Sequence, residues 1–367
     1  MIKTKAALIQ TLNQGFQISQ MELAPPKENE ILIKVHAVGV CHSDWHLVTG
    51  DTDHALPCVP GHEGCGEIVE LGKDCQGLKT GQKVILNWAP NCGDCFYCQK
   101  ARPSLCEAYT KHIWEGFLMD GTSRLSLNEK PVYHYCGLSC LSEYAVVPAS
   151  SCVVIPYDIS SEIGALVGCA VTTGVGAALN TVQVSRGDSV VVFGAGGVGL
   201  STIMGAAYTG ADKIIAVDVH ADKADVAIQC GATDFILYHN KIVDEIRSVT
   251  NGRGTDYVFE AIGNPAVQEI ALAAVRPGGT LVLSGISPMG TTSNFSGAAL
   301  TRQEKTVKGS YYGTSESSRD FLKYITLYQK GELPIEKMIK RYYSLNEVNE
   351  AYQDLISGKP GRGVIQI

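Results

Sequence analysis

A strand-like run that leads directly into a glycine-rich turn constrains the fold of this chain more than any other feature. The apolar residues 189–193 are followed by Gly194, Gly196, Gly197 and Gly199. The first, second and fourth of these glycines fit the spacing G-x-G-x-x-G. Such a turn requires glycine because the chain bends tightly, the backbone approaches a pyrophosphate, and the following helix packs closely on the strand. The segment therefore predicts a dinucleotide-binding unit in which the helix N-terminus faces the phosphates.

Apolar strand-like runs alternate with helical stretches in the part of the chain around this turn. Besides residues 189–193, such runs occupy 213–219, 256–263 and 279–285. This alternation predicts βαβ units around a parallel sheet that is buried on both faces. Residues 2–154 instead contain short β-type runs broken by Gly and Pro, so we expect a mostly β domain beside the α/β domain.

An acidic residue follows the turn at the distance expected for binding a ribose. Asp218 ends the next strand-like run, 19 residues after Gly199. Its carboxylate can accept hydrogen bonds from the adenosine ribose hydroxyls and would repel a 2′-phosphate, which favours NAD over NADP. The alternative is a glycine-rich turn in an α/β sheet that binds no nucleotide, with an incidental aspartate.

Four cysteines lie close together in the sequence: Cys92, Cys95, Cys98 and Cys106. Four thiolates at this spacing satisfy a closed tetrahedral zinc site, which leaves no open coordination position and is therefore structural. An iron–sulfur cluster uses the same ligands and is the rival interpretation. Disulfides are less favoured, because the chain has 13 cysteines, an odd number, and its N-terminus does not read as a secretory signal. Both features predict a reducing, cytoplasmic location.

Three further side chains are candidates for a second metal site, although they lie far apart in the sequence. Cys41, His62 and Cys169 carry the thiol and imidazole groups that hold a catalytic zinc, which needs three protein ligands and one open position. Glu63 and Asp44 are nearby carboxylates that could bind or support the metal. Spacing alone does not join these residues, and a lone cysteine such as Cys169 is more often part of a core.

The charge and hydropathy patterns argue against two classes of partner. With 30 Lys and Arg residues against 37 Asp and Glu, the chain has a formal charge of −7 and offers no broad positive field for a nucleic acid. Residues 163–185 carry no charge and are long enough to span a bilayer. They include threonine, asparagine, glutamine and several glycines, so we expect a buried helix and loop and no membrane segment.

Together these features resemble the zinc-dependent medium-chain alcohol dehydrogenase family over essentially the whole chain. The family's zinc signature is matched by Gly61, His62, Glu63, Gly66, Gly72 and Cys75. The four-cysteine segment, the glycine-rich turn and Asp218 follow in the expected order. The resemblance implies a GroES-like catalytic domain (residues 1–170 and 311–367) and an NAD-binding Rossmann domain (171–310). The segment 106–169 is similar to the longer loop of the dimeric animal and plant enzymes, which implies a homodimer.

The resemblance also implies roles for the residues around a catalytic zinc. The zinc ligands would be Cys41, His62 and Cys169. Glu63 would lie close behind the metal, and Asp44 would fix the tautomer of His62 through a hydrogen bond. With the four-cysteine site, the family pattern implies two zinc ions per chain.

The remaining implied roles concern the proton, the cofactor and the substrate. Ser43 and His46 match a proton relay that leads to the surface. The positions that contact the cofactor are Thr173 beside the nicotinamide, Lys223 at the adenosine ribose, and Arg362 and His42 at the pyrophosphate. His42 replaces an arginine that is common in the animal enzymes. Trp88 and Tyr135 match positions that line the substrate pocket.

The implied activity is the reversible oxidation of an alcohol to its carbonyl by hydride transfer to NAD, and Trp88 and Tyr135 favour aromatic or allylic primary alcohols. Two alternative enzymes are a polyol dehydrogenase and a glutathione-dependent formaldehyde dehydrogenase. The latter branch uses an arginine shortly after the last structural cysteine, whereas residues 107–112 contain Lys111 and no arginine. The non-enzyme alternative is a nucleotide-binding structural protein. Such a protein would be expected to lose zinc ligands, yet all seven candidate ligands are present.

Overall fold

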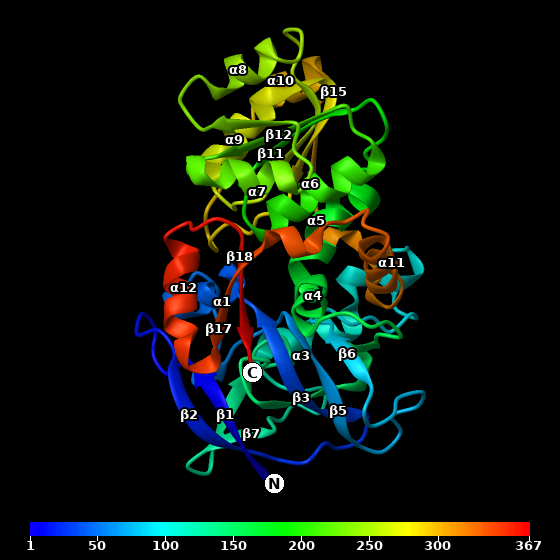
Figure 1. The fold of residues 1–367 in the computed structure, drawn as a ribbon, viewed down its shortest axis with the longest axis vertical. Helices are drawn as coiled ribbons and strands as arrows, with labels where there is room; N and C mark the ends of the chain where they lie inside the picture. The colour runs from blue at the N-terminus through cyan, green and yellow to red at the C-terminus, as the bar shows by residue number, and fades with distance from the viewer.

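The computed structural model describes residues 1–367 and contains three β-sheets. Figure 1 shows two parts of the molecule. The upper part is built from the middle of the chain, drawn green to yellow, and the lower part contains both chain ends, drawn blue, cyan and red. This arrangement of an α/β part beside a mostly β part confirms the fold class expected from the sequence.

The sheet of the upper part has six parallel strands in the order β13-β12-β11-β14-β15-β16. They are β11 (Ser189–Phe193), β12 (Lys213–Asp218), β13 (Asp234–Leu237), β14 (Thr255–Glu260), β15 (Val275–Leu283) and β16 (Thr306–Gly309). Val190 and Val192 belong to one buried cluster, whereas Val191 and Phe193 belong to another. The two faces of β11 are therefore both covered, as in a doubly wound parallel sheet.

The connections of this sheet fix where a ligand can bind. The chain runs from β11 to its neighbours on one side and then crosses to β14 on the other side. Ligands of open α/β sheets bind beyond the carboxyl end of the strand at which the order reverses, which here is β11. The helices of this part are α6 (Gly197–Thr209), α7 (Ala224–Gln229), α8 (Ile242–Ser248), α9 (Pro265–Ala274) and α10 (Gly297–Arg302).

The lower part contains the other two sheets. One has the order β10-β6-β5-β3-β18-β17, with β9 also paired to β3, and the other has the order β1-β2-β7-β8-β4. The strands of the first are β3 (Glu30–Gly39), β5 (Gly64–Leu71), β6 (Lys83–Leu86), β9 (Tyr144–Pro148), β10 (Cys152–Val154), β17 (Ile339–Ser344) and β18 (Arg362–Gln366). Those of the second are β1 (Ile2–Leu8), β2 (Gln17–Leu23), β4 (Cys58–Val59), β7 (Leu125–Leu127) and β8 (Lys130–His134).

The C-terminal segment is an integral part of the lower part. Strand β18 pairs antiparallel with β3 and parallel with β17, so it lies inside the sheet between a strand near residue 30 and the edge strand β17. The helices of this part are α1 (His42–Thr49), α2 (Phe96–Gln99), α3 (Glu107–Glu115), α11 (Ser317–Gln329) and α12 (Val348–Ile356). The pairing of β18 places Arg362 beside the candidate site described below.

One helical segment, Ser161–Thr181, connects the two parts. It comprises α4 (Ser161–Leu166), α5 (Thr172–Gly176) and two π-helical turns, Val167–Val171 and Ala177–Thr181. Its length and apolar composition would suffice to cross a membrane, yet 83% of its apolar window is buried inside the fold. Helix α4 packs on β3 and β5, and α5 packs on α6. The segment is therefore a core helix, as the sequence predicted.

Candidate active site

Four potential metal ligands from distant parts of the sequence meet beside the central helix. Cys41 precedes α1, His62 and Glu63 precede β5, and Cys169 lies in the π-helical turn Val167–Val171. One ligand atom from each of these residues lies within 4.8 Å of those of the others. Turns of π-helix are rare and occur frequently at functional sites. The structure thus brings together the three dispersed residues considered from the sequence, with Glu63 as a fourth.

Hydrogen bonds fix the orientation of His62 in this cluster. Its Nδ1 lies 3.1 Å from Oδ1 of Asp44, and the same oxygen accepts a hydrogen bond of 2.7 Å from the backbone N–H of Gly61. Both Asp44 and His62 are buried. Because Nδ1 is engaged with the carboxylate, Nε2 is the ring nitrogen that is free to bind a metal.

The charges around the cluster suit a cation. A hydrogen bond from Cys169 is the largest cause that holds the pKa of Cys41 well below its usual value, and the charge of His62 lowers it further. Burial raises the pKa of Glu63 to about 7, although Arg362 opposes this shift. Oε1 of Glu63 is buried without a hydrogen-bond partner. Two sulfurs, one imidazole nitrogen and a nearby carboxylate oxygen form a donor set that fits zinc.

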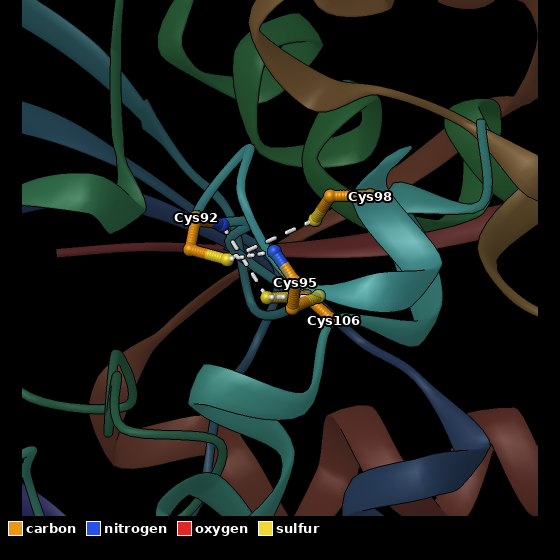
Figure 2. Close-up of side chains that lie close together, drawn as sticks. All are labelled: Cys92, Cys95, Cys98 and Cys106. Carbon is orange, nitrogen blue, oxygen red and sulfur yellow. Dashed lines mark hydrogen bonds between the residues drawn. The ribbon is translucent and has the colours of Figure 1, made fainter. Parts of the chain in front are cut away.

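The four clustered cysteines form a second group, shown in Figure 2. The sulfurs of Cys92 and Cys98 lie 4.0 Å apart, and those of Cys95 and Cys106 lie 3.9 Å apart. Four Zn–S bonds of about 2.3 Å in a tetrahedron require S···S separations of roughly 3.8 Å. None of the cysteines in the chain forms a disulfide. The backbone N–H groups of Cys92 and Cys95 also donate hydrogen bonds to sulfurs of the group, as expected for thiolates. This geometry fits one tetrahedral metal ion.

The glycine-rich turn lies between β11 and α6, at the switch point of the parallel sheet. Gly194 has φ +95°, a conformation that favours glycine. A Cβ atom at Gly199 would lie 1.7 Å from the carbonyl oxygen of Gly194, so helix and turn can approach only without a side chain. A Cβ atom at Gly196 would meet no atom within 4 Å. The turn is therefore tight on its protein side and open where a phosphate would lie.

Asp218 is held at the end of β12 beside this turn. Its Oδ2 accepts a hydrogen bond of 2.8 Å from the backbone N–H of Ala195 and lies 3.0 Å from Nζ of Lys223. The aspartate is 7% exposed. The carboxylate and the ammonium group predicted to contact the adenosine ribose thus form an ion pair next to the glycines.

Arg362 links the glycine-rich turn to the metal cluster. Its Nη2 donates a hydrogen bond of 2.5 Å to Oε2 of Glu63. A Cβ atom at Gly197 would lie 2.0 Å from Nη1 of the same arginine. The guanidinium therefore lies between the nucleotide turn and the carboxylate of the metal cluster. This contact was absent from the sequence-based roles, because residues 63, 197 and 362 share no local pattern.

Comparison with known proteins identifies the family of this chain. The protein-family model described as the alcohol dehydrogenase GroES-like domain matches residues 27–157. The family model described as zinc-binding dehydrogenase matches residues 197–329. The chain is 37% identical to an NDMA-dependent alcohol dehydrogenase of Amycolatopsis methanolica over 367 residues, with 99% of each chain covered. It is also 37% identical over 370 residues to an S-(hydroxymethyl)glutathione dehydrogenase of Escherichia coli, with full coverage of both. The chain belongs to the zinc-dependent medium-chain alcohol dehydrogenase family.

Solved structures of the family have the same fold. Benzyl alcohol dehydrogenase from Acinetobacter calcoaceticus superposes on this dehydrogenase with a TM-score of 0.93 at 29% identity, and all of both chains is covered. An alcohol dehydrogenase zinc-binding domain protein from Burkholderia ambifaria gives a TM-score of 0.94 at 30% identity, with 100% of this chain and 99% of that chain covered.

Aromatic side chains enclose the metal cluster of this dehydrogenase. The ring of His62 lies 6.4 Å from Trp88 and 5.6 Å from Tyr135, both in edge-to-face geometry. Sequence reasoning identified these two but missed three others around them. The ring of Trp88 also lies close to Trp114, Tyr311 and Tyr312, at 6.4, 5.3 and 4.4 Å. The only sequence signal that could have identified Tyr311 and Tyr312 is that two tyrosines stand side by side shortly after β16.

The structure also places the remaining residues that the sequence predicted for the site. Oγ of Ser43 lies 3.8 Å from the sulfur of Cys41, and the rings of His42 and His46 lie 6.4 Å apart. No direct hydrogen bond joins the side chains of Ser43 and His46. Thr173 is buried at the start of α5, which packs closely against the first turn of α6. Ser43 therefore lies beside the metal cluster and Thr173 in the helix that packs on the nucleotide turn, whereas His46 is placed only by its neighbour His42.

Proposed function

We propose that this chain is a zinc-dependent, NAD-linked alcohol dehydrogenase that interconverts primary alcohols and their aldehydes. The observation that carries the proposal is the cluster of Cys41, His62 and Cys169, which Arg362 connects to the glycine-rich nucleotide turn. In this proposal, the Rossmann domain (residues 171–310) binds NAD. The catalytic domain (residues 1–170 and 311–367) carries the metals and the substrate pocket.

Each residue of the cluster would have a distinct task. Zinc held by Cys41, His62 and Cys169 would supply Lewis acidity toward the alcohol oxygen, while NAD would accept the hydride. Asp44 keeps Nε2 of His62 directed at the metal position through the bond to Nδ1. Ser43 would accept the alcohol proton and pass it toward His46 at the surface, with the cofactor ribose or water completing the path. The four-cysteine group would hold a second, structural zinc.

The aromatic enclosure supports aromatic or allylic alcohols as substrates. Trp88 and Tyr135 lie edge-to-face with His62, and Trp114 packs against both of them; aromatic rings associate favourably in edge-to-face or offset geometry. A polyol would leave several hydroxyl groups without partners against these rings. A glutathione adduct is the second candidate, because the E. coli relative carries that name, although residues 107–112 supply no arginine for its carboxylates.

Rates on a small substrate panel with NAD test this function. We expect benzyl alcohol and cinnamyl alcohol to be oxidised with a kcat/KM about tenfold or more above those of sorbitol and the glutathione adduct of formaldehyde, which corresponds to roughly 1.4 kcal/mol. Metal analysis should give two zinc ions per chain. A chain with two zinc ions that oxidises none of these alcohols would contradict the proposal, and a preference for the glutathione adduct would favour the second candidate.

Replacing Asp218 with asparagine is expected to weaken the preference for NAD over NADP by about tenfold. The variant removes the charge that repels a 2′-phosphate and leaves Lys223, 3.0 Å away, without its counter-ion. The measurement is the ratio of kcat/KM with the two cofactors. Asp225→Asn is the matched control, because Asp225 is an exposed aspartate in the adjacent helix α7. An unchanged ratio in Asp218→Asn would remove the assigned role of this carboxylate.

We also propose that the enzyme is a cytoplasmic homodimer. Strand β16 is hydrogen-bonded only to β15 and leaves its other edge open, and open sheet edges are usually paired or covered. Ile286 and Met289, which follow β15, are 54% and 80% exposed. These features support pairing with a second copy at this edge. Thirteen cysteines without a disulfide support a reducing compartment.

A further inference from the structure

A buried tyrosine of the C-terminal helix contacts the carboxylate that holds His62. Tyr352 lies on α12, and its hydroxyl donates a hydrogen bond of 3.0 Å to Oδ2 of Asp44. Both side chains are fully buried, at 0% exposure. The sequence analysis assigned Tyr352 no role, because 308 positions separate it from Asp44.

The two oxygens of Asp44 have different partners. Oδ1 faces the backbone N–H of Gly61 and Nδ1 of His62, whereas Oδ2 has only the Tyr352 hydroxyl. A buried carboxylate needs donors for its lone pairs, and each missing donor has a substantial cost in a medium of low dielectric constant. The tyrosine therefore satisfies the oxygen that His62 does not use and stops the carboxylate from turning about its Cβ–Cγ bond.

Other contacts fix the position of the tyrosine itself. The side chain of Asn349, one turn earlier on α12, bonds the backbone N–H and C=O of Phe16 at 2.9 and 2.8 Å. The ring of Tyr352 lies 4.5 Å from that of Phe16 and stacks at 6.2 Å on Trp45, which belongs to the same helix as Asp44. Helix α12 therefore packs on α1, and these contacts hold the Tyr352 hydroxyl in place beside Asp44.

We infer that Tyr352 is a positioning residue for the metal ligand His62 and acts through Asp44. This inference rests on the proposed function, in which His62 binds the catalytic zinc. The ring contacts with Phe16 and Trp45 need only an aromatic ring, so packing does not account for the hydroxyl. The hydroxyl holds the Asp44 carboxylate, the carboxylate holds Nδ1 of His62, and Nε2 is thereby directed at the metal position.

Tyr352→Phe tests the inference, because it keeps the ring and removes only the hydroxyl. We expect a chelator to remove zinc from the Cys41, His62 and Cys169 site about tenfold faster than in the unmodified chain. Mutation of a residue that hydrogen-bonds a metal ligand lowers metal affinity by roughly 10- to 100-fold, and the expected change lies at the lower end of that range. Zinc in the four-cysteine site should leave at an unchanged rate. The Cys41→Ala variant, which lacks the affected phase of zinc release, assigns the two phases. With cobalt in place of zinc, the visible absorption bands should shift.

Tyr343→Phe is the matched control. The hydroxyl of Tyr343 donates a 2.7 Å hydrogen bond to Oδ2 of Asp354 in the same part of the fold, and this pair does not contact His62. Equal zinc release and equal cobalt spectra in the two Tyr→Phe variants would overturn the inference and leave Tyr352 a core residue. Zinc release is measured without substrate, so it tests the inference independently of the proposed function. A chain that holds two zinc ions but oxidises no alcohol would contradict the proposed function and leave the inference about Tyr352 untouched.

Discussion

Alanine in place of Cys41 or His62 is expected to lower kcat/KM for alcohol oxidation by about a thousandfold or more, while NAD binding remains measurable. Each variant removes one of three protein ligands from a cluster whose ligand atoms lie within 4.8 Å of one another. Lewis-acid stabilisation by a metal contributes several kcal/mol to a transition state, and each 1.36 kcal/mol is a factor of ten in rate. The nucleotide turn is built from other residues, so its affinity should change little.

Cys230→Ala provides the control for this experiment. Cys230 is a buried cysteine at the end of α7 and is not part of either metal group. Steady-state rates, zinc content and NAD affinity should be close to those of the unmodified chain. If Cys41→Ala or His62→Ala retained near-normal alcohol oxidation, the assignment of the catalytic metal to this cluster would be wrong.

Serine in place of Cys92 or Cys98 is expected to lower the thermal unfolding midpoint by about 5–10 °C and to release one zinc ion. A structural zinc site contributes directly to folding free energy because its geometry does not exist in the unfolded chain. A loss of about 2.5 kcal/mol corresponds to a shift of roughly this size in a folding unit of about 150–250 residues. The kcat of the remaining folded enzyme should change less than its stability, because this group lies outside the cluster of Cys41, His62 and Cys169.

Cys75→Ser is the matched control, since Cys75 is a partly exposed cysteine outside both metal groups. Calorimetry and metal analysis on the three variants give the comparison. An unfolding midpoint and zinc content that stay the same in Cys92→Ser would show that the four sulfurs do not hold a stabilising metal.

Local patterns in the sequence predicted the parts of the structure that depend on neighbouring residues. The strand and helix around Gly194–Gly199 and the four cysteines within one short segment are examples, and the structure has β11, α6 and the sulfur group where expected. Their geometry follows from spacing along the chain, because a tight turn or a tetrahedral thiolate group is built from residues a few positions apart.

The cluster of Cys41, His62 and Cys169 could not be predicted from local spacing. No spacing rule relates residues that three separate elements bring together, so from the sequence only the family resemblance assigns them to one site. The same reason explains the missed residues. Trp114 and Tyr352 were not identified, and neither was the contact between Arg362 and Glu63, because these side chains reach their partners only after α3, α12 and β18 have packed on the N-terminal sheet.

Two strands were also missed. Strand β17 (Ile339–Ser344) includes lysine and arginine, and its buried face is short. Strand β13 (Asp234–Leu237) is a four-residue edge strand. Both form because an adjacent strand supplies hydrogen bonds along their length, which is a tertiary effect that overrides weak local preference.

The position of Arg362 has a consequence for how the protein is made. Strand β18, which begins with Arg362, lies far beyond Cys169, the last of the seven candidate ligands in the sequence, so every cysteine and histidine of the two metal groups is synthesised before it. Since domains fold progressively from the N-terminus during translation, the nascent chain completes its zinc ligands before Glu63 acquires its counter-ion. A polypeptide that stopped before Arg362 would therefore carry all seven ligands but lack the arginine that pairs with Glu63.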